Sequence, residues 1–349
     1  MIRPGSGPVG DLPVRVDVRA LEHLLGERVL GIDCRESMDR STHALERALV
    51  ELPGGRRLDL VLKGTRVPHV AGGFERPRLV RDDAREGWAY RSLLDPIRFG
   101  TPRFLGVLHA GTGRERLVLE TVAGRSLAER GERRPWREAA RWLGRFHEWG
   151  RARTLPAGAE DRLLRQSEAL HFRWWRRALR RATAGGRTRA AERLRAIEAA
   201  YREAVVALSS TLTGLVHGEF YPSNILVERG SGGWRVRPVD WESIGVGPLL
   251  LDLAALTTGD WDDEERAAFY EAYEAAFVGG ARGDRAAETR VVCPRGLAAA
   301  RMVNAVQWLG WSSRWRAPSH HARDWLVEAE AAAADFAGPG AAMSRETRR

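Results

Sequence analysis

A group of polar residues in one short part of this chain has the types and spacing that phosphate chemistry requires. His217, Glu219 and Asn224 stand in the order H-G-E-x-x-x-x-N, and Asp240 and Glu242 follow in the sequence D-W-E. A carboxylate can orient an attacking hydroxyl, while an amide oxygen and a second carboxylate can hold Mg²⁺ against phosphate groups. The pattern therefore predicts transfer of a phosphoryl group to a hydroxyl, with Mg²⁺ as the metal.

The residues around this group predict a β-hairpin that would bring two of its members together. Residues 224–228 (NILVE) and 234–241 (WRVRPVDW) have strand chemistry and flank a turn rich in glycine and serine. Asn224 and Asp240 then lie at adjacent hairpin ends, where both could bind one metal ion. Asn and Asp are also common as plain turn residues at such ends, which is the alternative interpretation. The surrounding motif favours metal binding.

Lysine is nearly absent from the chain, and its one occurrence follows a predicted strand. Of the 56 Lys and Arg residues only Lys63 is a lysine, and it ends residues 58–63 (LDLVLK), which alternate in polarity. A compact ammonium differs in shape from a forked guanidinium, so a site for one point charge between phosphate oxygens would select lysine. The alternative is that the position of this lysine is due to chance.

The wider pattern changes from strands to helices along the chain. Residues 28–63 predict a small antiparallel sheet with a turn at Pro53–Gly55, and residues 82–94 predict a helix that begins at Asp82 or Asp83. Further strands are expected at 103–110 and 116–122, and helices at 135–150, 171–195, 191–210 and from 251 onward. The chain therefore predicts a strand-rich first part and a helical second part.

The motifs HGEFYPSNIL (217–226) and VDWE (239–242) resemble those of the aminoglycoside phosphotransferase and choline kinase group, distant relatives of the protein kinases. Gly218 stands where most protein kinases carry Arg, and no A-P-E follows, which is similar to the small-molecule branch. The resemblance implies a two-lobed, protein-kinase-like α+β fold with an N-terminal antiparallel sheet plus a helix and a larger, mostly helical C-terminal lobe. The expected divisions are a nucleotide-binding lobe (1–119), a hinge (120–124), a catalytic and substrate lobe (125–336) and a disordered tail (337–349).

The same resemblance implies roles for individual residues. It makes Lys63 the phosphate-binding lysine, Glu86 its partner on a helix, and Glu120 to Val122 the hinge whose backbone holds adenine. The metal ligands would be Asn224 and Asp240, the catalytic carboxylate Glu219 with His217 positioning it, and the buried acid that ties the loop in place Asp252. The co-substrate would be ATP, with GTP as the alternative, and the acceptor a hydroxyl of an amino sugar, an amino alcohol or a related metabolite.

Two departures from the family pattern support a second hypothesis. The catalytic position is normally Asp, and Glu219 places its carboxylate about one C–C bond farther out, enough to slow the reaction about a hundredfold if the loop does not adjust. The first hairpin, residues 34–44, has no glycine where many kinases have a glycine-rich loop, although Ser41 could meet phosphate oxygens there. The alternative is therefore a pseudokinase-like protein that binds nucleotide with little or no turnover.

The acceptor site is predicted less sharply than the nucleotide site. The acidic residues of 259–265 (GDWDDEE) could receive a cationic sugar, but acids at this spacing are also typical of a helix start, which we favour. Trp308, Trp311 and Trp315 could form a wall for sugar stacking, but their spacing of three and four is that of a helix stripe facing the core. Core packing is the favoured interpretation.

Charge and composition bear on the partners and the compartment. The net charge of +10 and the Arg and Trp residues of 171–195 raise the hypothesis of nucleic-acid binding, but no recognised motif accompanies them, so a solvated helical face is favoured. No run of residues is apolar enough for a membrane span or a signal peptide, which predicts a cytoplasmic protein. Cys34 and Cys293 lie far apart in sequence and are interpreted as reduced thiols.

Overall fold

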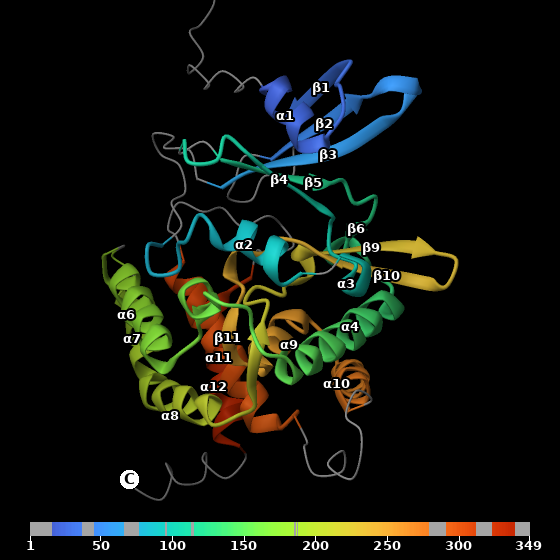
Figure 1. Cartoon of the computed structure of the whole chain (residues 1–349). Coiled ribbons are helices and arrows are strands. Elements are labelled where there is room, and N and C mark those ends of the chain that lie inside the picture. The colour runs from blue at the N-terminus through green and yellow to red at the C-terminus, as the bar shows by residue number, and fades with distance from the viewer. Residues whose placement is uncertain are drawn as a thin grey trace, which may run out of the picture.

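The computed structural model describes residues 16–36, 45–65, 77–94, 96–112, 115–184, 186, 188–278, 291–311 and 323–338. These residues form an α+β fold with two parts (Figure 1). A five-stranded antiparallel sheet lies at one end, a larger group of helices lies at the other, and helix α2 (Arg85–Ser92) lies between them. The predicted fold class is confirmed.

The sheet positions Lys63 because side chains along a strand point alternately to its two faces. Its order is β1-β2-β3-β5-β4, with bounds Gly31–Glu36 (β1), Leu45–Glu51 (β2), Arg57–Gly64 (β3), Phe104–Leu108 (β4) and Arg116–Glu120 (β5). Leu60 and Leu62 of β3 are buried in a small core with helix α1 (Val18–Leu25). Because successive side chains of a strand point to opposite faces, Val61 and Lys63 face away from that core, toward the helical part.

The turn between β2 and β3 depends on glycine. Residues Pro53–Gly55 form a 3-10 turn in which Gly54 and Gly55 have φ of 74° and 75°. These values lie in the left-handed region, where a side chain would be strained, so the sequence P-G-G suits the turn. The predicted turn is confirmed at this position.

The remaining elements belong to the helical part and to the connections. They are α3 (Pro96–Phe99), β6 (Arg125–Ser126), α4 (Arg133–Ala152), α5 (Ala159–Arg162), β7 (Leu164–Arg165), α6 (Glu168–Ala184), α7 (Thr188–Ala196), α8 (Glu198–Ser209), β8 (Thr213–Val216), β9 (Ile225–Gly230), β10 (Gly233–Pro238), β11 (Gly245–Pro248), α9 (Leu250–Leu256), α10 (Asp263–Val278), α11 (Pro294–Gly310) and α12 (Trp325–Ala337). Short 3-10 turns cover Leu127–Glu129, Pro222–Asn224 and Trp241–Ser243.

The large core is held by close helix packing. Helices α4 and α10 pack against each other, and Gly144 of α4 lies so near α10 that a Cβ there would be 2.4 Å from the carbonyl oxygen of Tyr273. Phe146, on the same helix, is fully buried among the rings of Trp142, Trp149 and Trp241. This packing fixes α4 and α10, which supply His147 and Tyr273 to the network of the buried acid discussed below.

Several boundaries differ from the sequence-based expectations. The predicted hairpin is present as β9 and β10, but the helix expected from Asp82 begins at Arg85, because Asp82 Oδ1 accepts the Ala84 N–H (3.0 Å) and forms a turn before it. Residues 191–210, predicted as one helical segment, are divided between α7 and α8 at Ile197, whose φ and ψ are −99° and 6°. Residues 37–44, with Ser41, Trp315 and residues 339–349 lie outside the described residues.

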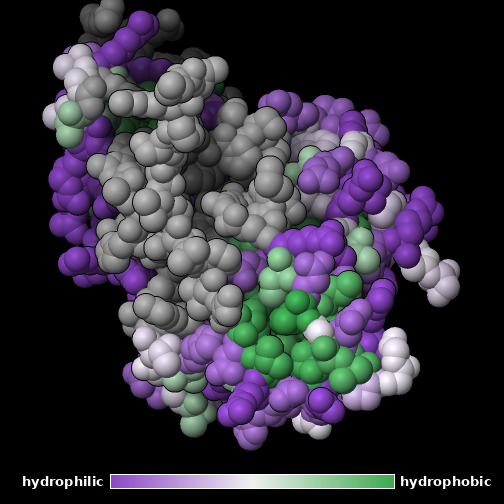
Figure 2. All heavy atoms as spheres, turned by 90° about the horizontal axis from the view of Figure 1, so that it is seen from above, coloured by the Kyte–Doolittle hydropathy of each residue, from purple (hydrophilic) through white to green (hydrophobic). Residues whose placement is uncertain are grey.

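The surface agrees with the charged composition. Figure 2 shows the molecule from above: most of the coloured surface is hydrophilic, and apolar side chains gather in one area. In the basic segment, Trp174 and Trp175 are 1% and 4% exposed, so their rings pack in the interior and are not available for stacking on bases. None of the described helices combines the length and the apolar character that a membrane span requires.

Burial of one histidine predicts a pH dependence of folding. His171 on α6 is 2% exposed, and this burial lowers its pKa from 6.5 to about 4. Because the unfolded chain binds the proton more readily, the stability is present above pH 6.5 and is lost as the pH falls toward 4. We expect the free energy of unfolding to fall by about 3 kcal/mol from this residue over that interval.

Urea unfolding at several pH values measures this effect. His171→Leu should reduce the slope of stability against pH between 6.5 and 4 and leave the slope near pH 8 unchanged, because the imidazole is neutral in both states there. An equal slope in both proteins over the acidic interval would contradict the prediction.

Candidate active site

A buried carboxylate holds the start of the predicted catalytic loop. Strand β8 ends at Val216, and Asp252 of α9, 1% exposed, accepts the N–H of His217 (2.6 Å) and the N–H of Gly218 (2.9 Å). The same carboxylate contacts Nε2 of His147 on α4 at 3.2 Å. Since hydrogen bonds to an ionised acceptor are strong, Asp252 fixes the backbone just before Glu219. This geometry agrees with the anchoring role predicted for Asp252.

Only glycine fits after His217. Gly218 has φ of 84°, and a Cβ at this position would lie 2.3 Å from the carbonyl oxygen of Ser243. The loop therefore runs against the segment that follows Asp240, with no room for a side chain. The close approach to Ser243 explains why residue 218 is glycine, where most protein kinases carry Arg.

The ring of His217 is neutral and oriented from both sides. Its Nδ1 lies 3.3 Å from the backbone N–H of Glu219, which it accepts, and its Nε2 then donates to the carbonyl oxygen of Val239 at 3.1 Å. Burial lowers the pKa of His217 below its ordinary value, which favours the neutral form. The side chain links the loop to the end of β10, as expected for a residue that positions Glu219 without transferring a proton.

Lys63 forms the electrostatic centre of the site. Its Nζ lies 2.7 Å from Oε2 of Glu86 and 2.8 Å from Oδ1 of Asp240, and all three side chains are largely buried. Burial alone would lower the pKa of Lys63, but the carboxylates of Asp240 and Glu86 raise it above its ordinary value. The ammonium is therefore charged, and it joins the sheet, α2 and the hairpin end. The predicted pairing of Lys63 with Glu86 is present in the structure.

The backbone at Asp240 is unusual. Asp240 has φ of 64° and ψ of 62°, one of two positive φ values among the described non-glycine residues. The following N–H, of Trp241, donates to Oε1 of Glu86 at 3.3 Å. Because Asp tolerates the left-handed region better than most residues, its type suits this turn as well as its contact with Lys63.

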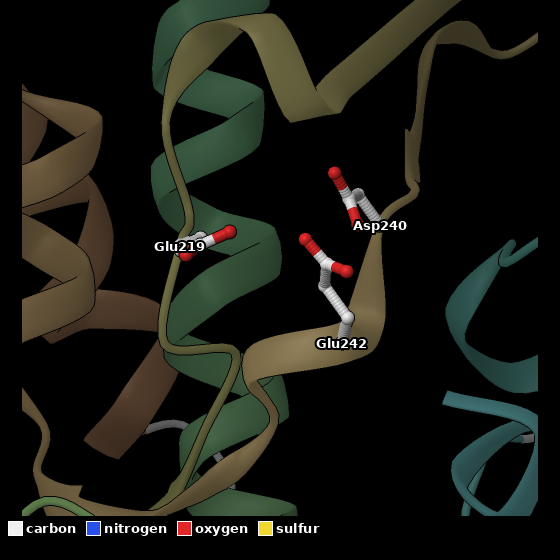
Figure 3. A group of neighbouring side chains, drawn as sticks. All are labelled: Glu219, Asp240 and Glu242. Carbon is white, nitrogen blue, oxygen red and sulfur yellow. The ribbon is translucent and has the colours of Figure 1, made fainter. Parts of the chain in front are cut away.

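Carboxylates converge at the end of the hairpin. Glu219, Asp240 and Glu242 each place an oxygen within 4.8 Å of the others, and Figure 3 shows their side chains pointing toward a shared space. Asn224 donates from Nδ2 to the carbonyl oxygen of Glu219 (3.0 Å), which leaves its Oδ1 to serve as a ligand. Oxygen donors of this kind match the preference of Mg²⁺, so the residues fit the predicted metal.

Two residues of this site had no role in the sequence-based prediction. Glu242 was seen only as part of D-W-E, yet its carboxylate lies in the converging group. Arg85 is buried and donates to the carbonyl oxygens of Glu242 and Val80, each at 2.9 Å. Nothing in the sequence distinguishes Arg85 from the other arginines, whereas the short spacing of Glu242 from Asp240 was a usable signal.

The segment predicted as the hinge follows β5. The N–H of Thr121 donates to the carbonyl oxygen of Asp59 (3.0 Å), and the side chain of Glu120 pairs with the buried Arg237 of β10. Within the described part of the chain, the N–H of Val122 donates no hydrogen bond, so it is available to a ligand. Gly124 lies against β9, since a Cβ added to it would be 3.0 Å from the carbonyl oxygen of Val227.

The acidic segment before α10 is occupied by helix capping. Asp262 accepts the N–H of Glu265 (2.7 Å), and Glu265 accepts the N–H of Asp262 (3.2 Å), the reciprocal arrangement of a capping box. The carboxylate of Glu265 also pairs with Arg133. The favoured interpretation of these acids as a helix start agrees with the structure.

The tryptophans of α11 pack on other rings. Trp311 is 6% exposed and stacks on Trp174, while Trp308 stacks on Trp325 with ring centroids 5.4 Å apart. The ring of Trp308 also meets Tyr221 of the loop after Glu219, at 5.2 Å. Trp311 therefore belongs to the core, and Trp308 supports residues closer to the loop.

Removing Lys63 should strongly destabilise the fold. In Lys63→Met the carboxylates of Glu86 and Asp240 would remain buried without their counter-ion, which costs about 3–5 kcal/mol. Arg56→Met is the control, because the pair of Arg56 with Glu27 is exposed and contributes at most about 1 kcal/mol. Urea unfolding measures both values.

A double variant tests the cause of this loss. Lys63→Met with Glu86→Gln removes one of the uncompensated charges and should recover part of the stability. A Lys63→Met protein no less stable than Arg56→Met would contradict the interpretation of Lys63 as a required counter-ion.

Comparisons with solved structures show which fold this is. The chain is 17% identical to a microcompartment-associated aminopropanol kinase, with a TM-score of 0.56 over 91% of this chain and 95% of that one. It is 12% identical to choline kinase from Cryptosporidium parvum (TM-score 0.53, 90% and 91% covered). It is 12% identical to spectinomycin phosphotransferase in complex with ADP and spectinomycin (TM-score 0.52, 90% and 94%).

These similarities support the two-lobed, protein-kinase-like fold of small-molecule kinases that the sequence predicts. The comparison with curated proteins found no match. The model of the phosphotransferase enzyme family matches residues 74–289, which is more than half of the chain and includes Glu86, the loop from His217 to Asn224, and Asp240. The chain belongs to the phosphotransferase enzyme family.

Proposed function

We propose that the protein transfers the γ-phosphoryl group of ATP to a hydroxyl of a small molecule, with Glu219 as the residue that receives the acceptor. The observation that carries this proposal is the ion network of Lys63, Glu86 and Asp240 beside the carboxylate of Glu219. A charged ammonium that already binds two carboxylate oxygens is suited to bind phosphate oxygens as well. GTP is the alternative co-substrate.

The nucleotide would lie between the two parts of the fold. We assign residues 1–119 to a nucleotide-binding lobe, 120–124 to a hinge, 125–336 to a catalytic lobe and 337–349 to a tail. The N–H of Val122, which donates to no acceptor among the described residues, supports backbone recognition of adenine next to Glu120. Ser41, proposed to meet phosphate oxygens, lies outside the described residues.

Asn224 and Asp240 are the proposed ligands of Mg²⁺, and the carboxylate of Glu242 is near enough to join them directly or through water. When bound, the metal neutralises charge on the phosphate oxygens. Lys63 would hold the phosphates from the side of the sheet, and His217 would keep the backbone of Glu219 in place. These roles divide binding and positioning among residues from different elements.

The proposed reaction breaks one bond to phosphorus and forms another. The acceptor oxygen forms a bond to the γ-phosphorus, the bond from that phosphorus to the β–γ bridging oxygen breaks, and ADP leaves. The carboxylate of Glu219 orients the acceptor hydroxyl and takes its proton. Asp252 holds the backbone before Glu219, so the carboxylate is positioned before the substrate arrives.

Candidate acceptors follow from the predicted class of amino sugars, amino alcohols and related metabolites. The names of the similar structures, which include aminopropanol, choline and spectinomycin, supply compounds for a first screen. The alternative function, a nucleotide-binding protein with little turnover, has its basis in Glu219, since a longer side chain than Asp changes where the carboxylate lies. The two functions differ in whether ADP is released when an acceptor is added.

Turnover should depend on both the charge and the length of residue 219. Glu219→Gln keeps the size but cannot take a proton, so we expect ADP release to fall by a factor of about 100 to 10,000. Glu219→Asp withdraws the carboxylate by about one bond and should cost about a factor of 100 if the loop is built for Glu.

A coupled assay of ADP release with the acceptor screen checks both variants. Wild-type rates in Glu219→Gln would show that the carboxylate takes no part in transfer. No release by the wild-type protein with any acceptor would favour the nucleotide-binding alternative.

Binding of ATP should depend on Mg²⁺ through Asp240. In Asp240→Ala we expect the affinity for ATP in the presence of Mg²⁺ to fall about tenfold or more, because a charged ligand of the metal is lost. Asp33→Ala is the control, since Asp33 lies on β1 and is largely exposed. Calorimetry with and without Mg²⁺ gives the affinities, and equal Mg²⁺-dependent binding in Asp240→Ala and wild type would overturn the assignment.

A further inference from the structure

A cavity adjoins the loop that carries Glu219. It has a volume of about 300 Å³, and its lining includes Arg130, Trp136, Tyr221, Trp261, Arg323 and Trp325. These residues come from distant parts of the sequence: the turn before α4, the catalytic loop, the segment before α10, and the start of α12. The cavity is large enough for a small ligand of one or two rings.

The wall of the cavity nearest the reaction is the catalytic loop itself. Tyr221, Pro222 and Ser223 line the cavity, and the N–H of Tyr221 donates to the carbonyl oxygen of Glu219 at 2.7 Å. A ligand seated here would therefore contact the residues directly after Glu219.

Aromatic rings form much of the remaining surface. Trp136 and Trp261 meet edge to face with centroids 4.6 Å apart, and Trp325 is supported from behind by Trp308. The indole N–H of Trp136 donates to the carbonyl oxygen of Arg130 at 3.2 Å, and this hydrogen bond fixes the ring. Rigid rings of this kind bind the flat faces of sugars or aromatic groups through their large apolar area.

Two guanidinium groups, those of Arg130 and Arg323, and one carboxylate, that of Asp260, line the cavity. Arg130 has no acidic partner among the described residues; it lies over the ring of Trp234 at 5.1 Å, and its buried Nε donates to no described acceptor. Nη1 of Arg323 donates to Asp260 at 3.4 Å and to Glu328 at 3.5 Å, at the long end of the hydrogen-bond range. Although Asp260 lines the cavity, its side chain is 97% exposed and water screens its charge, so the positive charge that no described acid pairs is that of Arg130.

Besides Asp260, which pairs with Arg323, two further acids next to the cavity are already engaged. Asp262 and Glu265 cap α10 by binding each other's backbone, and Glu265 also pairs with Arg133. These are the residues that a cationic amino sugar would need. A ligand with several ammonium groups would meet Arg130 and Arg323 instead, with like charges opposed.

We propose that this cavity binds the acceptor of the proposed phosphoryl transfer, and that the acceptor is a ring compound bearing a carboxylate or similar anionic group. The anion would be held by Arg130 and Arg323, the ring would lie against Trp136, Trp261 and Trp325, and a hydroxyl would face the catalytic loop. This inference rests on the proposed function, because only a transferase has an acceptor. The charge preference of the cavity concerns ligand binding and does not depend on transfer.

Three probes that share a phenyl β-D-pyranoside and carry different charges test the preference. Phenyl β-D-glucuronide is anionic, phenyl β-D-glucoside is neutral and phenyl β-D-glucosaminide is cationic, and each is titrated by calorimetry into the full chain without nucleotide. We expect the glucuronide to bind about tenfold or more tightly than the glucosaminide, because a hydrogen bond to a charged group has this worth. Added salt should weaken binding of the glucuronide and leave that of the glucoside unchanged.

Variants locate the preference in the cavity. Arg130→Gln and Arg323→Gln should each lower affinity for the glucuronide about tenfold, while Arg323→Lys should retain most of the preference because it keeps the charge. Arg202→Gln is the matched control, since Arg202 is exposed on α8 and pairs with Glu198. The salt dependence of the wild-type protein needs no variant, so it tests the charge preference even if a substitution prevents folding.

The outcomes separate this inference from the proposed function. Equal or tighter binding of the glucosaminide, no binding of the glucuronide at millimolar concentration, or a preference that persists in both Gln variants would overturn the inference. A charge preference that depends on the two arginines, without ADP release when ATP and Mg²⁺ are added, supports the inference and counts against the proposed transfer alone.

Discussion

The ammonium of Lys63 joins the sheet to two parts of the fold whose carboxylates would otherwise repel each other. Glu86 on α2 and Asp240 at the hairpin end are both acidic and largely buried, and each lies within hydrogen-bond distance of Nζ. Moving these charges out of water costs several kcal/mol for each ion, so mutual attraction compensates the cost without making the pair a large source of stability. The arrangement has its value in position: one point charge fixes the distance from the sheet to the hairpin.

A second buried network sets the other side of the site. Asp252 holds two successive N–H groups of the loop, and His147 and Tyr273 extend this network through α4 and α10. The loop can approach Ser243 closely only because residue 218 is glycine. The position of Glu219 thus depends on helix packing far from the cleft, because Gly144 permits the approach of α4 and α10. The carboxylate proposed for catalysis is in this way held on its loop by a rigid core.

The sequence predicted the parts of the site that depend on local structure. Asn224 and Asp240 were expected to meet because a hairpin of known pattern joins them, and Lys63 was noticed because it is the only lysine. The turn at Pro53–Gly55 was also predictable from local sequence, because its backbone conformation favours glycine. The contact of Lys63 with Glu86 needed the family resemblance, because no local pattern joins a strand to a helix across 23 residues.

Features that depend on tertiary structure could not be read in this way. Arg85 has a buried role in the structure, yet in sequence it is one of many arginines. The cavity beside Tyr221 is assembled from four separated segments, and no periodicity predicts that Arg130 and Arg323 meet there. The acidic segment 259–265 suggested a site for cations, but backbone N–H groups of α10 and Arg133 take up two of its carboxylates.

The same contrast bears on how members of one fold acquire different acceptors. The residues proposed to hold phosphates come from the sheet, the hairpin and α2, where packing and charge balance leave little freedom to change. The residues that line the cavity lie on turns and helix ends, where a substitution alters charge without disturbing Lys63 or Asp252. Exchange of carboxylates for guanidinium groups on these turns would change the preferred acceptor while leaving phosphoryl transfer intact. The acceptor of this protein is therefore better inferred from the charges of its own cavity than from the names of proteins that share its fold.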